Sequence, residues 1–271
     1  MGISRQSFYS ALKRYSNREQ ELLKVRNLVL EIRMNFPRIG TRKLYFLLKN
    51  RFVNEGIKIG RDALFSYLKR ENLSIQPQKS YTKTTFSKHW LRKHPNLYKD
   101  IELTRPEQVF VSDITYVKTK ESTCYLSLVT DAYSRKIMGY SVSENMNAEN
   151  VSKALKMAVK KRINKETLIH HSDRGLQYCS EYYQNILKIN KIEPSMTDGY
   201  DCYQNALAER INGILKQEFL IEKTKNMEEL NQMVKQSVYL YNNLRPHLSL
   251  DMETPEARHK KSEEMIISPD L

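Results

Sequence analysis

Hydrophobic spacing divides the chain into a helical first part and a mixed second part. Apolar residues with helical spacing predict helices over residues 4–15, 19–35, 42–51 and 61–71. Later, β-branched and aromatic runs predict strands over residues 109–117, 123–131, 136–142 and 167–171. Helical spacing returns over residues 147–162, 205–219 and 227–242. The resulting order of strand, strand, strand, helix, strand, helix, helix indicates a mixed α/β domain behind a helical region.

Charge separates the same two parts. Residues 1–100 contain 22 Lys and Arg against 7 Asp and Glu, whereas residues 101–271 contain 23 against 24. A basic half joined to a neutral half is typical of a nucleic-acid-binding module tethered to another domain. Because no long apolar run or lipidation signal supports a membrane, we expect a cytoplasmic, nucleoid-associated protein with no membrane partner.

The cysteines do not indicate a disulfide framework or a zinc site. Cys124, Cys179 and Cys202 are odd in number, far apart and never in a Cys-x-x-Cys pair. His89 and His94 have no cysteine pair beside them, so their ligand count does not support zinc. We expect reduced, structural thiols.

One acid lies inside a predicted strand. Asp113 falls in the middle of residues 109–117, a run apolar enough for a strand covered on both faces. An unpaired ionised acid in such a place costs several kcal/mol or more, so it needs a cation, a set of donors or a raised pKa. The plainer alternative is an acid satisfied by neighbouring Ser and Thr hydroxyls.

Two further acids follow. Asp173 comes just after a predicted strand, where α/β folds place their chemistry, and Glu209 lies on a predicted amphipathic helix. The polar stripe of that helix contains Asn205, Glu209, Asn212 and Lys216. Such a stripe on its own is also typical of a solvated helix face. The spacing is more telling, because 59 residues separate Asp113 from Asp173 and 35 separate Asp173 from Glu209.

This spacing resembles the second-reading-frame (OrfB) catalytic subunit of bacterial insertion-sequence transposases of the IS-three family. The matching stretches are residues 40–45 (GTRKLY), 112–116 (SDITY), 171–178 (HSDRGLQY), 205–209 (NALAE) with Lys216, and 241–247 (YNNLRPH). They extend over nearly the whole chain. The resemblance implies an α/β fold with a ribonuclease-H-like integrase catalytic core, preceded by a basic, all-helical helix-turn-helix region. It also implies that Asp113, Asp173 and Glu209 are the catalytic residues.

Three carboxylates without a nucleophilic Ser or Cys arrangement favour metal-assisted phosphoryl transfer. By analogy with two-metal sites, we expect Asp113 to bridge two Mg²⁺ ions and Asp173 and Glu209 each to bind one, with Mn²⁺ able to substitute. The resemblance implies that the site first hydrolyses the bond at the end of the element. The freed 3′-hydroxyl then attacks a new phosphodiester.

Basic residues in both halves are candidate DNA contacts. We expect Lys216 to hold a phosphate near the cut, and Arg174, like His171, to contact DNA or orient Asp173. Basic residues of the helical half and of the linker that follows it are expected to bind double-stranded DNA, namely Arg42, Lys43, Arg61, Lys69, Arg70, Lys83, Arg92 and Lys93. A plain helical bundle with a basic surface and a solvated tether are the alternatives.

Domain boundaries follow from these patterns. We expect a partial helix-turn-helix over residues 1–17, a helical DNA-binding domain over 18–74, a basic linker over 75–100, the integrase core over 101–221 and a helical extension over 222–271. Phe8 and Leu12 need a preceding helix to bury them. The resemblance implies that an upstream reading frame supplies it by fusion. The alternative is that residues 4–15 pack on the helix over 19–35.

The function predicted is a DNA transposase that acts on element ends and target DNA as a homo-oligomer. A ribonuclease-H-like nuclease or resolvase would share the acids but needs no basic N-terminal module. A non-catalytic DNA-binding repressor would not need the three acids and Lys216 together. Arg245 and His247, which close the last predicted helix, are expected to cap and pack rather than to contact DNA.

Overall fold

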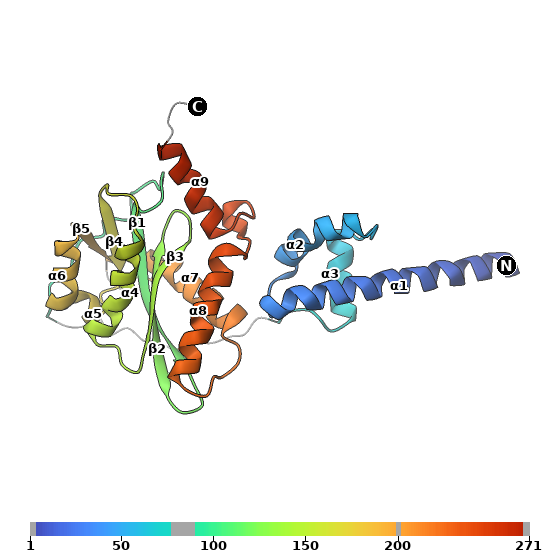
Figure 1. Cartoon of the computed structure of the whole chain (residues 1–271), viewed down its shortest axis with the longest axis horizontal. Coiled ribbons are helices and arrows are strands. Elements are labelled where there is room, and N and C mark those ends of the chain that lie inside the picture. Colours follow the sequence, from blue (N-terminus) through green and yellow to red (C-terminus); the bar gives the residue numbers. More distant parts are fainter. Residues whose placement is uncertain (1–3, 77–89, 199–201, 268–271) are drawn as a thin grey trace. The chain divides into compact units, whose positions relative to one another are not determined.

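The computed structural model describes residues 4–76, 90–198 and 202–267, and divides into two compact units at residue 78 (Figure 1). In residues 4–76, the helical unit consists of α1 (Arg5–Asn35), α2 (Thr41–Asn54) and α3 (Arg61–Arg70). Their apolar faces meet in a core that includes the fully buried Val25, Val29, Ile39, Leu44, Leu48, Leu64 and Leu68. The helices predicted over residues 42–51 and 61–71 are therefore confirmed.

The first helix differs from the sequence prediction. α1 is one unbroken helix, whereas two were predicted, because residues 16–18 contain neither Gly nor Pro to end it. Ser4 caps its start by accepting a hydrogen bond from the backbone N of Ser7. Phe8 and Leu12 are 55% and 56% exposed. The N-terminal part of α1 extends past α2 and α3 (Figure 1). The expectation of two separate helices was wrong, and so was the alternative that the first packs back on the second.

The second unit is built around one five-stranded sheet. Its strands are β1 (Val109–Lys118), β2 (Thr123–Asp131), β3 (Ile137–Ser143), β4 (Leu168–Ser172) and β5 (Ile192–Met196). The sheet order is β3-β2-β1-β4-β5. β1, β2 and β3 pair antiparallel, whereas β4 pairs parallel with β1, and β5 with β4. This arrangement is the ribonuclease-H-like fold that the sequence resemblance predicted.

Helices cover both faces of the sheet. They are α4 (Ala148–Lys161), α5 (Leu176–Cys179), α6 (Glu181–Ile189), α7 (Ala206–Ile214), α8 (Met227–Asn243) and α9 (Pro255–Ile267), with short turns η1 (Cys202–Asn205), η2 (Leu215–Phe219) and η3 (Leu248–Leu250). Side chains of α4, α5 and α6 pack on Phe110 of β1. Ala208 of α7 packs on Val109 and Val111, which face the other way.

The α5 helix, the α6 helix and the β5 strand were not predicted. All three fall between the predicted strand over 167–171 and the predicted helix over 205–219. Glu193 and Pro194 interrupt the apolar pattern of β5. A proline is tolerated there because β5 is an edge strand, hydrogen-bonded on one side to β4.

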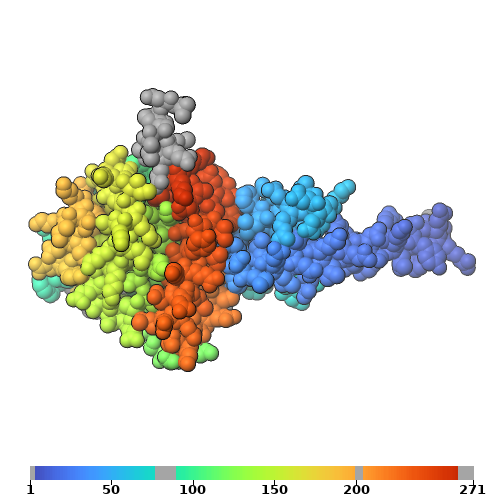
Figure 2. Space-filling view, viewed as in Figure 1, coloured from blue at the N-terminus to red at the C-terminus, as the bar shows by residue number. Residues whose placement is uncertain are grey.

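The last helices complete the unit at the β3 side of the sheet. α8 packs against β3, and in Figure 2 it is the orange segment beside the yellow-green α4. The α4 helix approaches β3 so closely that a Cβ at Gly139 would collide with the carbonyl oxygen of Ala154. Among the described residues, no helix combines the length and apolar composition that crossing a membrane requires.

Candidate active site

Asp113 and Asp173 come side by side through strand pairing. In the parallel pair of β1 and β4, Val111 lies opposite His171, and each acid follows two residues later in its own segment. The alternation of β1 places Asp113 on the same face as Val109 and Val111, which is the α7 face. The predicted strand covered on both faces is only half right, because residues 109–112 are buried and residues 113–117 are partly exposed.

Asp173 lies in the short loop between β4 and α5. Its Oδ1 accepts a hydrogen bond of 3.0 Å from the backbone N of Gly175. A Cβ on Gly175 would lie 3.0 Å from that same oxygen, so a larger residue there would crowd the Asp173 carboxylate. Arg174, between them, donates its Nε to the carbonyl oxygen of Thr197 beyond β5. Arg174 therefore ties the loop to the edge of the sheet, and DNA contact by it remains a prediction.

The polar stripe of the predicted helix faces β1. Asn205 Nδ2 donates to the carbonyl oxygen of Ser112 at 3.1 Å, and Asn212 Nδ2 donates to Asp113 Oδ2 at 2.8 Å. Both asparagines are buried, so this is not a solvated helix face. Glu209, between them in the sequence, is exposed. α7 thus presents the third acid beside the first, and its two asparagines fix the register between helix and strand.

Lys216 continues this contact past α7. The helix changes to a π-helical turn over Leu215–Phe219, and Lys216 Nζ donates to Thr115 Oγ1 at 3.2 Å. The same ammonium lies 4.4 Å from the centroid of the Tyr116 ring. Lys216 is therefore held on β1 two residues beyond Asp113, on the side where a substrate phosphate is expected.

Electrostatic repulsion couples the three acids. Burial, and then the charge of Asp173, raise the pKa of Asp113 to about 7, with a smaller contribution from Glu209. Hydrogen bonds from Asn212 and from the backbone N of Ile114 oppose this shift. Burial and the charge of Asp173 also raise the pKa of Glu209. The arrangement favours binding of positive charge, because a cation would relieve the repulsion and stabilise the ionised carboxylates.

The donor set fits a hard divalent cation. Carboxylate oxygens are the ligands that Mg²⁺ takes, and Mg²⁺ usually binds one or two of them and completes its octahedron with water and substrate phosphate. In the part of the chain that is described, no three Asp, Glu, His or Cys side chains lie close enough together to hold a metal ion by themselves, so water and substrate oxygens would have to complete the coordination. Beside Asp113, the buried Oδ1 of Asn212 has no hydrogen-bond partner within the described chain. An open site of separated carboxylates therefore fits Mg²⁺ better than a closed structural metal site.

Two buried histidines hydrogen-bond the segments that carry the acids. Sequence patterns did not single out His170 for this role. His170 Nε2 lies 2.7 Å from Ser112 Oγ and 3.0 Å from the Tyr183 hydroxyl. Burial lowers the pKa of His170 to about 3, so it is neutral at physiological pH. His171 is fully buried, with Nδ1 2.9 Å from Ser195 Oγ and Nε2 3.1 Å from the carbonyl oxygen of Gln204. His171 therefore joins β4, β5 and the turn before α7, and does not point to solvent or DNA.

The predicted DNA-contacting residues of the helical unit lie on its surface. Arg42, Arg61, Lys69 and Arg70 are exposed, and Lys43 is partly exposed. Two of them already pair with acids, because Arg61 Nε lies 2.9 Å from Asp62 Oδ1 and Arg70 Nε lies 3.0 Å from Glu71 Oε1. Surface pairs of this kind are weak and leave the cations available to phosphate. Of the residues predicted as a basic linker, Arg92 and Lys93 are exposed, and Lys83 lies outside the described residues. The neighbouring Leu91, Leu97 and Tyr98 pack on the core of the sheet unit, so this part of the predicted linker is not a free tether.

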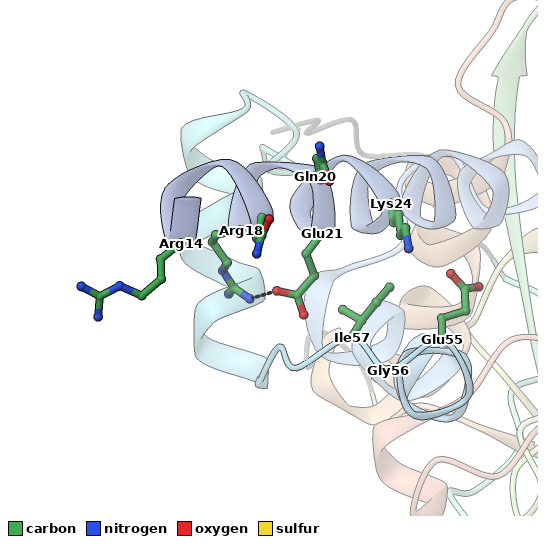
Figure 3. Close-up of a pocket in the computed structure, with 9 residues that line it drawn as sticks. Arg14, Arg18, Gln20, Glu21, Lys24, Glu55, Gly56 and Ile57 are labelled. Atoms are coloured by element: carbon green, nitrogen blue, oxygen red, sulfur yellow. Dashed lines mark hydrogen bonds and ion pairs between the residues drawn. The ribbon is translucent and has the colours of Figure 1, made fainter. Parts of the chain in front are cut away.

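A hollow in the helical unit is not a comparable site. It lies between α1 and the residues that follow α2 (Figure 3). Glu21 occupies its middle, where it pairs with Arg18 at 2.6 Å and accepts a 2.6 Å hydrogen bond from the backbone N of Lys58. Its lining mixes the acids Glu21 and Glu55 with the cations Arg14, Arg18 and Lys24. Because its acid is satisfied by the chain itself, we assign it no ligand.

Known proteins resemble this chain in sequence and fold. Two matches to the family described as "Integrase core domain" cover residues 104–202 and residues 190–255. The "Insertion element IS600 uncharacterized 31 kDa protein" of Shigella sonnei is 35% identical over 270 residues, 97% of each chain. "Transposase InsF for insertion sequence IS3A" of Escherichia coli (strain K12) is 36% identical over 152 residues, which are 56% of this chain and 53% of InsF.

A solved structure extends the fold comparison. A chain of the simian T-cell lymphotropic virus intasome, solved in complex with PP2A regulatory subunit B56 gamma, matches with a TM-score of 0.51. The identity is 17%, over 82% of this chain and 70% of that chain, so the likeness is one of fold. Sheet order, helix placement and this match together define a ribonuclease-H-like integrase core. The chain belongs to the integrase-core family of insertion-sequence transposases, as its motifs predicted.

Proposed function

We propose that this protein is a DNA transposase that cuts the ends of an insertion sequence and joins their 3′ ends to other DNA by metal-dependent phosphoryl transfer. The observation that carries the proposal is that three acids lie near one another where β4 ends beside the middle of β1, near enough for the charges of two to act on the third. Asp113 and Asp173 follow paired positions of these strands, Glu209 lies on the helix across them, and the charges of both raise the pKa of Asp113. Family membership supports the same reaction class.

The chain's own residues divide the work. Asp113, Asp173 and Glu209 would hold two divalent cations, Mg²⁺ or in its place Mn²⁺, with Asp113 shared between them. Bound there, the ions would activate the attacking water or 3′-hydroxyl and stabilise the leaving oxygen. Asn212 keeps the Asp113 carboxylate in one orientation through its 2.8 Å hydrogen bond. Lys216, held on Thr115, is placed to bind a phosphate of the DNA end next to the acids.

One site serves both chemical steps in this proposal. Hydrolysis at the element end and attack by the freed 3′-hydroxyl on a second phosphodiester need the same stabilisation of a phosphoryl group in transfer. The chain's contribution is positional, because the hydrogen bonds from Asn205 to Ser112 and from Asn212 to Asp113 hold the Asp113 carboxylate in place before substrate arrives. Preorganised charge of this kind needs no rearrangement during the reaction.

The helical unit and the basic linker are proposed to bind double-stranded DNA, at element ends and target, in the cytoplasm at the nucleoid. The exposed Arg42, Arg61, Lys69 and Arg70 support the proposal, and the binding should weaken steeply with added salt. Two ends must be joined in one complex, so we expect at least two copies of the chain on DNA. We also keep the expectation that a segment from an upstream reading frame, fused to this chain, covers the exposed Phe8 and Leu12.

A cleavage and strand-transfer assay on a labelled duplex that carries the element end tests the proposal. Asp113→Asn, Asp173→Asn and Glu209→Gln should each lower both activities by roughly 10³-fold or more, because each removes a ligand of the proposed metal site. Their DNA binding in gel shift should persist, because the basic residues are unchanged. Glu107→Gln, which changes a buried acid outside the site, is the matched control and should keep both activities.

The same assay separates the alternatives. A nuclease or resolvase would cut without joining the 3′ end to a second duplex, and a repressor would bind the end without cutting. Substantial turnover by any of the three acid variants would refute the assignment of these residues. Comparing this chain with its fusion to the upstream segment, on paired ends, decides whether that segment is needed.

A further inference from the structure

The π-helical turn after α7 carries two charged residues with different partners. Lys216 reaches toward β1, where it contacts Thr115 and the Tyr116 ring. Glu218, two residues later, is paired with Arg245 at the end of α8. π-Helical turns are rare and often occur at functional sites, because the extra residue per turn redirects side chains. The direction of Lys216 therefore depends on what holds this turn in place.

Arg245 holds the turn through a buried two-pronged ion pair. Its Nε donates to Glu218 Oε2 at 2.8 Å and its Nη2 donates to Glu218 Oε1 at 2.6 Å. The Arg245 side chain is 2% exposed and that of Glu218 is 17% exposed. The remaining Nη1 donates to His247 Nε2 at 3.0 Å. This geometry fixes both the distance and the angle between the two segments, as paired Arg–carboxylate hydrogen bonds do.

The end of α8 is itself fixed to the sheet. The Asn242 side chain accepts a hydrogen bond from the backbone N of Ile137 at 2.9 Å and donates one to its carbonyl oxygen at 3.0 Å. The Tyr241 hydroxyl donates to the carbonyl oxygen of Arg135 at 3.1 Å. A connected path of polar contacts therefore leads from β3, through α8 and Arg245, to the π turn. α8 also packs on β3, which supports this path (Figure 1).

From this path we propose that Arg245 and Glu218 are a positioning pair, which holds the π turn so that Lys216 stays against β1 beside the catalytic acids. The inference rests on the proposed function, in which Lys216 binds a DNA phosphate. A buried ion pair is a poor device for stability alone, because apolar residues of similar volume often serve as well. In this protein the Arg245–Glu218 pair instead holds the π turn in a single conformation. The sequence motif at residues 241–247 thereby acts on the active site without contacting DNA.

The sign of a change in DNA affinity tests the proposal. Glu218→Gln removes one negative charge, so net charge alone predicts tighter binding to DNA. The positioning pair predicts the opposite, about 10-fold weaker binding of the full chain to an element-end duplex at physiological salt. It also predicts that the slope of log affinity against log salt falls by about one, as for Lys216→Ala, because one phosphate contact is lost.

A double-mutant cycle on the strand-transfer rate shows whether the effect acts through Lys216. Glu218→Gln and Lys216→Ala should each lower the rate about 10-fold or more, and the double variant should be no slower than Lys216→Ala alone. Glu107→Gln is the matched control, because it changes a buried Glu whose partners, Arg162 and His259, lie outside the turn. Its effect should simply add to that of Lys216→Ala. Urea unfolding first establishes that each variant is folded.

Arg245→Lys provides a second route to the same answer. It keeps the buried positive charge and loses the two-pronged geometry, so its loss of rate should lie between wild type and Glu218→Gln. The proposal is overturned if the Glu218 or Arg245 effect adds fully to that of Lys216→Ala, or if Glu218→Gln binds DNA more tightly with an unchanged salt slope. Asp113→Asn in the same assay distinguishes failure of the positioning pair from failure of the proposed function. Retained strand transfer in that variant would refute the proposed function itself.

Discussion

Two clusters of acids flank the buried part of β1, residues 109–112. Glu107 and Asp131 lie on one side, and Asp113, Asp173 and Glu209 on the other, and the two clusters differ in how their negative charge is balanced. In the structural cluster, Glu107 and Asp131 are almost fully buried, and His259 lies between them, 3.7 Å from Glu107 Oε1 and 3.5 Å from Asp131 Oδ2. Backbone N–H groups of Ser134 and Asn164 donate to Asp131 and Glu107 at 2.8 and 2.7 Å. This cluster therefore contains its own cation and its own donors.

The proposed catalytic cluster, Asp113, Asp173 and Glu209, also gathers acids, but without a cation of its own among the partners of Asp113. Asp113 receives hydrogen bonds from Asn212 and Ile114, which are neutral donors, and feels the charges of Asp173 and Glu209. Its pKa is raised to about 7. The comparison teaches that burial of acids does not by itself mark an active site. What distinguishes the catalytic cluster is that its carboxylates repel one another and are placed to receive positive charge from outside the chain.

The largest effect on stability should come from the structural cluster. Burial lowers the pKa of His259, but hydrogen bonds to Asp131 and Glu107 outweigh it and raise the pKa to about 9. A raised histidine pKa contributes stability that is fully present below the unfolded value of about 6.5 and is lost as pH rises through about 9. His259→Gln should therefore lower the free energy of unfolding by roughly 3 kcal/mol at pH 6.

Urea unfolding at pH 6 and pH 9.5 measures this loss. The wild type should lose stability between the two values, and the variant should lose much less. Strand transfer per folded molecule should remain, because His259 lies outside the catalytic cluster. Equal pH dependence in both proteins would show that His259 is not the cation of the structural cluster.

A smaller effect of opposite sign is expected at the catalytic cluster. Asp113→Asn should stabilise the metal-free protein at pH 8 by about 1 kcal/mol, because it removes a charge that burial and Asp173 disfavour. An acid with a raised folded pKa lowers stability as pH rises from its unfolded value of about 4 through about 7. The gain from Asp113→Asn should therefore be clearly smaller at pH 5 than at pH 8. Thermal unfolding in EDTA at the two pH values measures it, and about 1 kcal/mol corresponds to roughly 2–4 °C. A destabilised variant at pH 8 would contradict the repulsion.

The smallest expected effect is on the pH dependence of strand transfer, when Asn212, the neutral hydrogen-bond donor to Asp113, is replaced. Asn212→Ala removes the hydrogen bond that favours the ionised form of Asp113, so the pKa of Asp113 should rise further. In the pH profile of the strand-transfer rate, the rise on the acid side should move to higher pH by about half a unit to one unit. Asn205→Ala, which loses a hydrogen bond to the backbone of Ser112, is the control and should leave this rise in place. An unchanged rise in both variants would remove Asn212 from the account.

Residue type and hydrophobic spacing predicted most of the strands and helices whose formation depends on neighbouring residues in the sequence. The strands β1 to β4 follow from β-branched runs. The spacing of Asp113, Asp173 and Glu209 predicted their catalytic role, which stays a prediction. The continuity of α1 was missed because Ser16 and Asn17 only weaken a helix and do not end it. β5 was missed because Pro194 argues against a strand unless that strand lies at the edge of a sheet. The sequence alone does not show which strand is at the edge.

Contacts between distant residues could not be predicted in the same way. The bond from Asn212 to Asp113 joins residues 99 apart, and that from Ser134 to His259 joins residues 125 apart. Their meeting depends on how α7 and α9 pack, which helical periodicity alone does not specify. The sequence showed Arg245 and His247 as a helix end, and burial of both confirms the expected packing. It could not show that the partner of Arg245 is Glu218 on the turn that carries Lys216.

The measurement that tests the central claim most directly is calorimetric titration of the full chain with Mn²⁺ near pH 7, in two buffers of different ionisation enthalpy. If the catalytic cluster takes a divalent cation, the wild type binds Mn²⁺ and releases protons, because the pKa of Asp113 is about 7 and the metal-bound carboxylate is ionised. Asp113→Asn should lose most of the binding and the proton release, whereas Glu107→Gln should keep both. Binding that survives Asp113→Asn unchanged, or wild-type strand transfer that needs no divalent cation, would contradict the account.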